Sequence, residues 1–482
     1  MKSWSAADHD PRRPSPHAKG GALMSVSLQD AIATSGLRSG GTLSFHHHLR
    51  NGDAVLNATL QACAALGLRD LHIAPSSVFP CHAPLVDHIR TGTVTRITTA
   101  YMSGPVAEAI SGGVLAQTVT LQTHGGRARR ISNGTLPIDL AVIAAPSVDD
   151  DGNIGGADGV NACGPLGYAM VDAAHARHVI AVTDEPCGPL RRVCIPAGDI
   201  QVVRVVSIGD AAYLTSGTTA RAPGAEAQAI ADRTLALIAA SGLLQDGFAF
   251  QAGAGATSLA TARQVARLMG DTGVKGAFIA GGITAAAVEM QRAGLFGKLL
   301  NVQSFDRAAV ADYAVNPDHI AMSAAEYASP DHPDTVADRL DVMLLGAAEV
   351  DVNFNVNVTT TGQGRIIGGS GGHADTAAGA KLAIVTMPLR ARETPRVVAQ
   401  VRCLTTPGTS IDAVVTEAGV AINPERADLS ERLRHSGVEV IGIEDLQSMA
   451  GPSLPTNASG RVVAKVEHRN GSILDRVRAT SD

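Results

Sequence analysis

The chain has 482 residues, which is long for a single hydrophobic core, so two or more domains are expected. Its formal charge of −6 and the lack of basic blocks argue against electrostatic binding to nucleic acid or anionic lipid. Hydrophobic residues make up 45% of the chain, charged residues 17%, and there are 51 glycines, a composition typical of a globular protein with close backbone packing and many loops.

The N-terminal segment, residues 1–24, is predicted to be a disordered extension, because Pro, Ser, His and charged residues cannot build a core. It lacks the apolar core of a secretory signal, and no apolar stretch is long enough to span a bilayer, so we expect a cytoplasmic protein that does not bind membranes. The 6 cysteines form no CxxC pair, so they are expected to be reduced and structural, and no metal site is predicted.

Three consecutive histidines follow a short apolar run near residue 45. If residues 42–50 form one strand, alternation assigns two sets of side chains to opposite faces: polar Ser44, His46, His48 and Arg50, and largely apolar Leu43, Phe45, His47 and Leu49. A row of donors ending in a permanent cation suits a carboxylate-rich ligand better than a metal. The alternative is a set of histidines satisfied in a polar layer between domains.

A second basic motif, THGGRARR, covers residues 123–130. It places His124 and Arg127 beside two glycines, whose backbone N–H groups can converge on an anion while the guanidinium binds a carboxylate. A solvated basic turn is the alternative reading of the same residues.

Two stretches far apart in the chain read alike: IDLAVIAAPSVDDDGNIGG from Ile138 and LDVMLLGAAEVDVNFNVNV from Leu340. Each is an apolar run of strand length that ends in a polar loop, as expected of a buried parallel strand. A second matched pair follows at similar intervals: DAAHARHVIAVTD comes after the first stretch and DTAAGAKLAIVTM after the second. We therefore predict an internal duplication of an open α/β domain; chance resemblance between two alanine-rich segments is the alternative.

The predicted domains cover residues 25–220 and 221–482, with a linker near residues 215–225. The stretch from Ala225 is predicted to be an amphipathic helix closed by Gly242. Near the C-terminus, RVVAKVEHRNGSILDRV consists of two alternating runs around Asn470-Gly471, which predicts a β-hairpin assigned to the second domain.

Two glycine-rich loops are candidate oxyanion or thioester sites. The first contains Gly253 and Gly255 between an apolar strand and a helix, a context that presents free N–H groups, although a lone GxG is a weak signal. The second contains Gly369, Gly371, Gly372 and His373, and its backbone can approach a ligand closely. A structural tight turn is the alternative for this second loop.

Glu349 ends the apolar strand of the second repeat, where Ser147 stands in the first. In open α/β sheets, ligands bind at the carboxyl ends of the strands, so this acid is well placed for chemistry. Only one of the two repeats carries the carboxylate, and this asymmetry favours a catalytic function for Glu349.

Seven motifs, in order along about residues 25–475, resemble the citrate lyase alpha chain family: LSFHHHLRNGDAVLN, CHAPLVDHIRTGTVTRI, THGGRARR, IAGGITAAAVEMQRAGLFGKLLNVQSFD, EVDVNFNVNV, GGSGGHADTAAGAKLAIV and VVTEAGVAINPER. The resemblance implies two domains of the coenzyme A transferase (NagB/RpiA-like) type. It also implies a reaction in which citrate displaces acetate from an acetyl thioester, before a beta subunit cleaves the citryl thioester to oxaloacetate. The thiol would belong to a phosphoribosyl-dephospho-coenzyme A group on an acyl carrier (gamma) subunit of an oligomeric complex, with no cofactor bound covalently to this chain.

The resemblance gives the candidate residues specific expectations. Glu349 would be the catalytic carboxylate, acting either as a covalent nucleophile or as an assistant to direct attack by citrate. The glycine loops would stabilise the oxyanion, and the polar histidine face with Arg127 would bind the carboxylates of citrate. The chain departs from the family at Ser103, where arginine is expected before Gly104-Pro105. Citramalate lyase alpha chain, a stand-alone coenzyme A transferase and a non-catalytic anion sensor are the competing functions.

Overall fold

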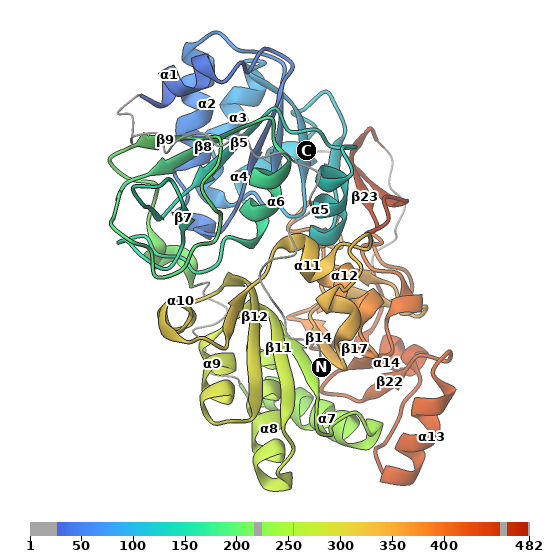
Figure 1. Cartoon of the computed structure of the whole chain (residues 1–482). Coiled ribbons are helices and arrows are strands. Elements are labelled where there is room, and N and C mark those ends of the chain that lie inside the picture. Colours follow the sequence, from blue (N-terminus) through green and yellow to red (C-terminus); the bar gives the residue numbers. More distant parts are fainter. Residues whose placement is uncertain (1–26, 216–223, 254, 454–459, 481–482) are drawn as a thin grey trace.

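A computed structural model describes residues 27–215, 224–253, 255–453 and 460–480. The chain forms two α/β halves, each built on a largely parallel sheet with helices packed around it (Figure 1). The expected disordered extension and most of the expected linker lie outside the described residues. The predicted α/β class is therefore confirmed for the two halves.

The first half contains a nine-stranded sheet in the order β24-β23-β4-β3-β2-β1-β5-β8-β9. All neighbouring strands are parallel except the β23–β24 pair. The strands are β1 Thr42–Phe45, β2 Leu71–Pro75, β3 Val94–Thr99, β4 Val119–Leu121, β5 Leu140–Ala144, β8 His178–Thr183, β9 Ile200–Arg204, β23 Val462–Glu467 and β24 Ile473–Arg478.

The predicted C-terminal hairpin forms, but it belongs to the first half. Its strands pair antiparallel around the Asn470-Gly471 turn, where Gly471 has a positive φ of 89°. Strand β23 then pairs in parallel with β4, with Lys465 opposite Thr120. This placement corrects the expectation that the hairpin belongs to the second domain: β4 offers an unpaired sheet edge, and adding a strand satisfies its backbone groups.

The second half contains an eight-stranded sheet in the order β13-β12-β11-β10-β14-β17-β21-β22. Only the β21–β22 pair is antiparallel. The strands are β10 Ala249–Ala252, β11 Gly276–Ile283, β12 Phe296–Ser304, β13 His319–Ala321, β14 Val342–Leu345, β17 Leu382–Thr386, β21 Ala413–Val415 and β22 Val420–Ile422.

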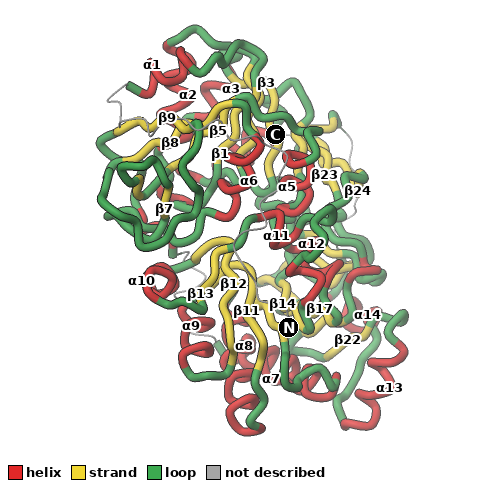
Figure 2. Tube along the Cα trace, viewed as in Figure 1, coloured by secondary structure: helices red, strands yellow, loops and turns green. Residues whose placement is uncertain are grey.

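Helices pack around both sheets (Figure 2), and along the chain they alternate with strands through much of each half. The first half contains α1 Leu28–Thr34, α2 Val55–Ala65, α3 Leu85–Arg90, α4 Pro105–Ser111, α5 His124–Ser132 and α6 Gly167–His175. The second contains α7 Ala225–Ser241, α8 Ala256–Thr272, α9 Ala285–Arg292, α10 Arg307–Val315, α11 Ala324–Ala328, α12 His373–Gly379, α13 Ala427–Ser436 and α14 Ile443–Ala450. Helix α7 ends at a left-handed Gly242, as predicted. No helix in the described part of the chain is long and apolar enough to cross a membrane.

Strand β14 is buried on both faces, and its alternate residues pack into two apolar clusters of the second half. Val342 and Leu344 pack into the cluster beneath α7 and α8, whereas Met343 and Leu345 pack into the cluster that includes α14. A strand buried on both faces is read as a continuous apolar run, which is how this segment appears in the sequence. The chain leaves the sheet at Leu345 and reaches Glu349 within one short loop.

The two sheets share an order and a register. The central order β4-β3-β2-β1-β5-β8-β9 corresponds to β13-β12-β11-β10-β14-β17-β21. The Thr42 N–H donates to Asp139 Oδ2 at 2.8 Å, and the Ala249 N–H donates to Asp341 Oδ2 at 2.7 Å. These bonds make the loops after β1 and β10, which carry the histidines and the first glycine pair, equivalent in position.

Candidate active site

Glu349 is the first residue of β15 (Glu349–Asp351), a short strand that follows the carboxyl end of β14. Its side chain is 7% exposed. Oε2 accepts hydrogen bonds from Asn357 Nδ2 at 2.8 Å and from the Arg402 backbone N–H at 2.9 Å. Oε1 faces Gly362, where an added Cβ would lie 2.8 Å away. One oxygen is thus held while the other is directed to the side of Gly362.

Asn357, in β16 (Val356–Asn357), holds this carboxylate and the loop that follows it. The residue is fully buried and pairs with Glu349 across an antiparallel hairpin. Besides Glu349, Nδ2 donates to the Thr360 carbonyl at 3.0 Å. Oδ1 accepts the backbone N–H groups of Thr359 and Thr360, both at 2.9 Å. One amide therefore fixes both the acid and the backbone beside it.

A cavity of about 250 Å³ opens beside Glu349. Its walls carry both acidic and basic side chains, so it is suited to a polar ligand rather than an apolar one. The lining residues are Glu349, Gly362, Glu393, Thr394, Pro395, Val398, Gln400, Arg402, Pro452 and Ser453. The sequence predicted that Glu349 ends the apolar strand; in the structure that strand ends at Leu345, and Glu349 begins the next short strand, beside this cavity.

The second glycine loop lies between the two halves and is linked to Glu349 through residues 357–360. The Gly368 N–H donates to the Thr359 carbonyl at 3.2 Å. A Cβ on Gly369 would lie 2.4 Å from the Ala100 carbonyl oxygen, so only glycine fits this contact with the first half. The Gly371 N–H donates to that same carbonyl at 3.1 Å.

The neighbouring residues of this loop have specific contacts. A Cβ on Gly372 would lie 2.7 Å from the Tyr327 hydroxyl. His373 begins α12, with Nδ1 2.8 Å from Thr406 Oγ1 and Nε2 2.9 Å from the Gly346 carbonyl. Burial lowers the pKa of His373 to about 4, so the ring is neutral near pH 7. The loop is thus a tight interdomain contact whose imidazole is already hydrogen-bonded.

The first glycine pair brackets a position outside the described residues, residue 254. The Gly253 N–H donates to the Leu344 carbonyl at 3.1 Å, which ties this loop to the carboxyl end of β14. Gly255 is the N-cap of α8, and a Cβ added to it would meet nothing within 4 Å. The predicted strand–loop–helix arrangement is confirmed.

The predicted strand through the histidines is wrong beyond Phe45, because β1 ends there and the chain turns into a 3-10 helix over Arg50–Gly52. All three histidines are buried, so no alternation separates them. The Nδ1 atoms of His46 and His48 lie 2.5 Å apart, and His47 Nδ1 lies 2.6 Å from Ser76 Oγ.

His47 instead joins a ring cluster with His124 and Tyr168. The ring centroids of His47 and His124 are 5.5 Å apart, and those of His124 and Tyr168 are 4.5 Å apart. The His124 backbone N–H donates to the Gly371 carbonyl at 2.8 Å, which joins this cluster to the second glycine loop. Two groups of candidate residues, distant in sequence, therefore meet between the halves.

Burial keeps these histidines neutral. It lowers the pKa of His46 to about 4 and, with Arg127 nearby, the pKa of His124 to about 3; the pKa values of His47 and His48 also fall well below the usual range. Neutral imidazoles can donate hydrogen bonds to a carboxylate but add no charge. Among the described residues, Ser44 Oγ and His124 Nδ1 are buried without a hydrogen-bond partner.

Arg50 supplies the charge that the histidines lack. Its backbone has a φ of +54°, a region that residues other than glycine rarely adopt. Its guanidinium lies 5.5 Å from the Phe79 ring centroid and 4.9 Å from that of Phe305. Within the described ranges it has neither an acidic partner nor a side-chain hydrogen bond, and the residue is partly exposed. Burial lowers its pKa, but a guanidinium stays charged.

Arg127 is engaged within the first half. Its guanidinium binds Asp172 through two hydrogen bonds of 2.7 and 2.8 Å and donates to the Ala74 carbonyl at 2.8 Å. The side chain is 1% exposed. A buried arginine paired in this way holds α5 against α6 and has little left to offer a ligand.

Sequence patterns alone did not find Asn357, Phe79 or Phe305. Asn357 lies in the polar segment that follows the apolar strand, so its place near Glu349 was open to prediction. The strand register shows that the two residues are direct partners across the hairpin. The phenylalanines carry no local signal, since both contact Arg50 from distant parts of the sequence, Phe79 within the first half and Phe305 from the second. In the described part of the chain, no group of three or more His, Cys, Asp or Glu side chains is placed to hold a metal ion.

Comparison with known proteins identifies the family. The family model for citrate lyase, alpha subunit (CitF) matches residues 22–480. The citrate lyase alpha chain of Escherichia coli (strain K12) is 42% identical over 463 residues, covering 95% of this chain and 91% of that protein. The citrate lyase alpha chain of Klebsiella pneumoniae is 40% identical over 458 residues, covering 94% and 90%.

Solved structures agree. A crystal structure described as a citrate lyase alpha subunit in complex with citrate, from Streptococcus mutans, matches with a TM-score of 0.93 and 40% identity, covering 100% of this chain and 95% of that one. A Pseudomonas malonate decarboxylase hetero-tetramer in complex with malonate matches with a TM-score of 0.62 at 16% identity, covering 84% and 81%, and shows a shared fold alone. The chain therefore belongs to the citrate lyase alpha subunit family, the citrate coenzyme A-transferase component of the citrate lyase complex.

Proposed function

We propose that this chain exchanges acetate for citrate on the phosphoribosyl-dephospho-coenzyme A thioester of an acyl carrier subunit. The observation that carries this proposal is Glu349, a carboxylate held by Asn357 and the Arg402 N–H at the edge of a cavity beyond strand β14. The cavity would admit the thioester end of the carrier arm. The beta subunit would then cleave the citryl thioester to oxaloacetate and the acetyl thioester.

The exchange needs two acyl transfers, and its bonds balance without a metal or redox partner. In the direct route, a citrate carboxylate oxygen attacks the acetyl carbonyl carbon, the carbon–sulfur bond breaks, and a mixed anhydride and the carrier thiolate result. The thiolate then attacks the citryl carbonyl and releases acetate. In the covalent route, Glu349 makes the first attack and citrate enters later. Both routes place Glu349 beside the reacting carbonyl.

Citrate would bind between the two halves, with Arg50 as the main charge. The Streptococcus mutans relative was solved in complex with citrate, which supports citrate as the ligand here. Ser44, His46, His48 and His124 would donate hydrogen bonds as neutral groups. Arg127, which is already paired with Asp172, would act through the positions of α5 and α6 and is left out of the proposed contacts.

The oxyanion would be stabilised by backbone N–H groups of the glycine loops. The N–H groups of Gly253 and Gly371 already donate to carbonyls, so Gly255, Gly369 and Gly372 are the better donors. His373 is hydrogen-bonded on both ring nitrogens and would fix the start of α12 rather than contact the thioester.

The two halves would descend from one coenzyme A transferase-like domain by internal duplication. Their shared strand order and the matching bonds to Asp139 and Asp341 support this origin. We also propose that the chain works in the cytoplasm, in an oligomeric complex with the beta and gamma subunits.

The test of the reaction uses the purified chain and acetylated carrier subunit. Citrate, citramalate and malate are offered separately, while released acetate and the carrier mass are followed. We expect conversion of acetyl-carrier to citryl-carrier with citrate. Conversion only with citramalate would support the same acyl exchange with a different substrate. Conversion only with free acetyl-coenzyme A as the donor would indicate a stand-alone transferase. No exchange with any acid would refute the proposal.

The test of Glu349 is its replacement by Gln. We expect Glu349→Gln to lower kcat by about 100-fold or more, since the amide removes both negative charge and nucleophilicity. Glu393→Gln is the matched control, because Glu393 lines the same cavity with an exposed side chain. Hydroxylamine added during turnover separates the routes: a hydroxamate on Glu349 indicates the covalent one. An unchanged kcat in Glu349→Gln would contradict the assignment.

A further inference from the structure

Arg50 is held between aromatic rings from both halves of the molecule. Phe79, from the first half, follows β2, and Phe305, from the second, follows β12. The guanidinium lies 5.5 Å from the first ring centroid and 4.9 Å from the second. A cation over the face of an aromatic ring is attracted by its quadrupole, more strongly when both are removed from water. The two rings together restrict the position of the guanidinium.

The backbone of Arg50 is held in its unfavourable conformation by its neighbours. The Cys81 N–H donates to Asn51 Oδ1 at 2.9 Å, and Asp53 Oδ2 lies 3.1 Å from His82 Nε2. These bonds tie the 3-10 turn after the histidines to the loop that follows β2. A positive φ at a residue other than glycine costs of order 1 kcal/mol or more, and such strain is typical of functional positions.

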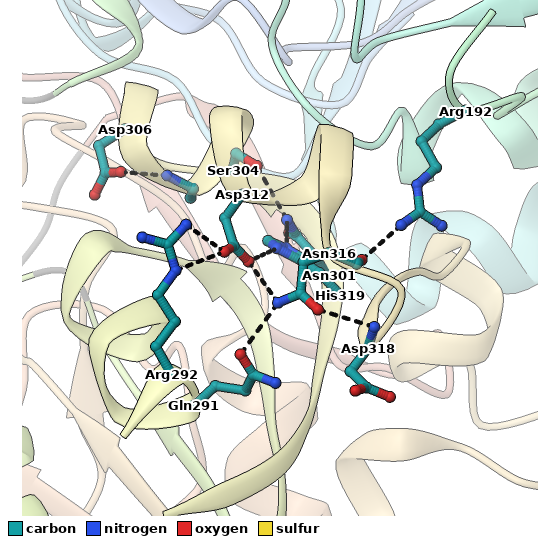
Figure 3. A network of polar contacts seen from close by, with 11 residues as sticks. Arg192, Gln291, Arg292, Asn301, Ser304, Asp306, Asp312, Asn316, Asp318 and His319 are labelled. Carbon is teal, nitrogen blue, oxygen red and sulfur yellow. Dashed lines mark hydrogen bonds and ion pairs between the residues drawn. The ribbon is translucent and has the colours of Figure 1, made fainter. Parts of the chain in front are cut away.

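A buried network supports the end of β12 from which Phe305 extends (Figure 3). Asn301 Nδ2 donates to Ser304 Oγ at 3.0 Å and lies 2.8 Å from His319 Nε2. His319 Nδ1 lies 2.9 Å from Asp312 Oδ2, so this ring nitrogen carries the proton and Nε2 accepts from the amide. The strand end is therefore held by side-chain hydrogen bonds immediately before Phe305.

Gly282 makes room for the Phe305 ring. A Cβ on Gly282 would lie 2.1 Å from a ring carbon of Phe305, so no larger residue fits beside the ring. The Phe305 N–H donates to the Ile283 carbonyl at 2.9 Å, which fixes the backbone from which the side chain extends. Next to it, Gln303 Nε2 donates to the His47 carbonyl at 2.9 Å. Gln303 in β12 thus contacts the histidine loop, and Phe305 immediately after the strand contacts Arg50.

We propose that Phe305 is a positioning residue for citrate: it fixes the unpaired Arg50 guanidinium, so that the second half of the molecule sets the affinity of a carboxylate site carried by the first. This inference rests on the proposed role of Arg50. Phe305 itself does not touch the reacting atoms. Because it acts through Arg50, its loss should weaken citrate binding without slowing the acyl transfer.

The test compares Phe305→Leu, Phe305→Tyr and Arg50→Ala in the full chain, measuring the citrate Kd by calorimetry and then KM and kcat with acetyl-carrier. Leucine keeps apolar volume and removes the ring, so we expect Kd and KM for citrate to rise roughly tenfold with kcat nearly unchanged. Tyrosine keeps the ring and should restore both. Arg50→Ala should weaken binding on the order of 50-fold.

Phe296→Leu is the matched control. Phe296 begins β12, the strand that Phe305 follows; it is 3% exposed and packs against Phe248 and Phe250 rather than against a cation. We expect this variant to lose stability and to keep the citrate Kd of the original chain. If Arg50→Ala leaves Kd unchanged, the proposed citrate site is wrong; if Arg50→Ala weakens binding and Phe305→Leu does not, only the positioning role is overturned.

Discussion

Asn357→Asp tests whether the amide of Asn357 controls Glu349. The substitution keeps an oxygen that can accept the N–H groups of Thr359 and Thr360, but it replaces the donor that faces Glu349 Oε2 at 2.8 Å. With both groups ionised, the two carboxylates would repel each other at this distance. With one proton between them, an O–H replaces the original N–H and the local geometry survives.

The size of the repulsion follows from the contact. Two unit charges 2.8 Å apart repel by about 6 kcal/mol at an effective dielectric constant of 20. This exceeds the thermal energy about tenfold, so the pair should hold one shared proton around neutral pH and titrate as a unit. The proton is lost only at more alkaline pH, and the repulsion then appears in full. In the folded variant the carboxylate pair still holds a proton that the unfolded chain has already released. The free energy of unfolding of Asn357→Asp therefore falls as pH rises, until the pair loses this proton.

The assay is the pH dependence of kcat for acetyl-carrier conversion, with thermal unfolding in the same buffers. We expect Asn357→Asp to approach the original kcat at mildly acidic pH and to lose activity and stability together as pH rises. Asn355→Asp is the control, because Asn355 Nδ2 donates to Asp351 and not to Glu349. An activity ratio between Asn357→Asp and the original chain that does not change with pH would refute the reasoning.

Two further predictions concern the contact between the halves. Gly369→Ala places a methyl group 2.4 Å from the Ala100 carbonyl oxygen, so we expect a loss of about 1–3 kcal/mol in the free energy of unfolding, measured in denaturant; an unchanged midpoint would show that the loop yields. In the folded chain, burial holds the pKa of His46 near 4 and that of His124 near 3, below the unfolded value of 6.5. Their contribution to the free energy of unfolding is therefore complete above pH 6.5 and falls below it, as the unfolded chain takes up protons. Each histidine contributes about 1 kcal/mol per pH unit in that window, and His124→Asn should flatten the slope; an equal slope would contradict this.

Local patterns predicted what local forces determine. The helix over Ala225–Ser241, the hairpin at Asn470-Gly471 and the strand before Glu349 each depend on periodicity or turn chemistry within a few residues. The rule that ligands bind at the carboxyl ends of parallel strands then placed Glu349 beside its cavity. These features needed no knowledge of the rest of the chain.

Features that depend on distant partners were missed or misplaced. The histidines were assigned to a strand because alternation is a strand rule, yet β1 stops at Phe45 and its neighbours bury all three rings. The hairpin joined the first sheet because β4, about 340 residues earlier, offers an edge, as the register of Lys465 with Thr120 records. Arg127 finds Asp172 on a different helix. Periodicity carries no information about such pairings.

The hairpin that follows the central apolar strand carries a different first cross-strand pair in each half. In the first half, Ser147 pairs with Gly155, and the Ser147 hydroxyl donates to the Gly155 carbonyl at 3.2 Å. In the second half, the equivalent pair is Glu349 and Asn357, an acid and the amide that holds it.

The turn within each hairpin is otherwise the same. Asp149 Oδ1 accepts the Asn153 N–H at 2.8 Å, and Asp351 Oδ1 accepts the Asn355 N–H at 3.1 Å. The same hairpin thus carries an acid and the amide that binds it in the second half, and a serine and a glycine in the first. The loop after the first strand shows the reverse division: the first half carries the histidines and Arg50, and the second a glycine loop. In the proposed function, the first half would bind citrate and the second would carry the thioester chemistry, so activity would depend on the contacts between them.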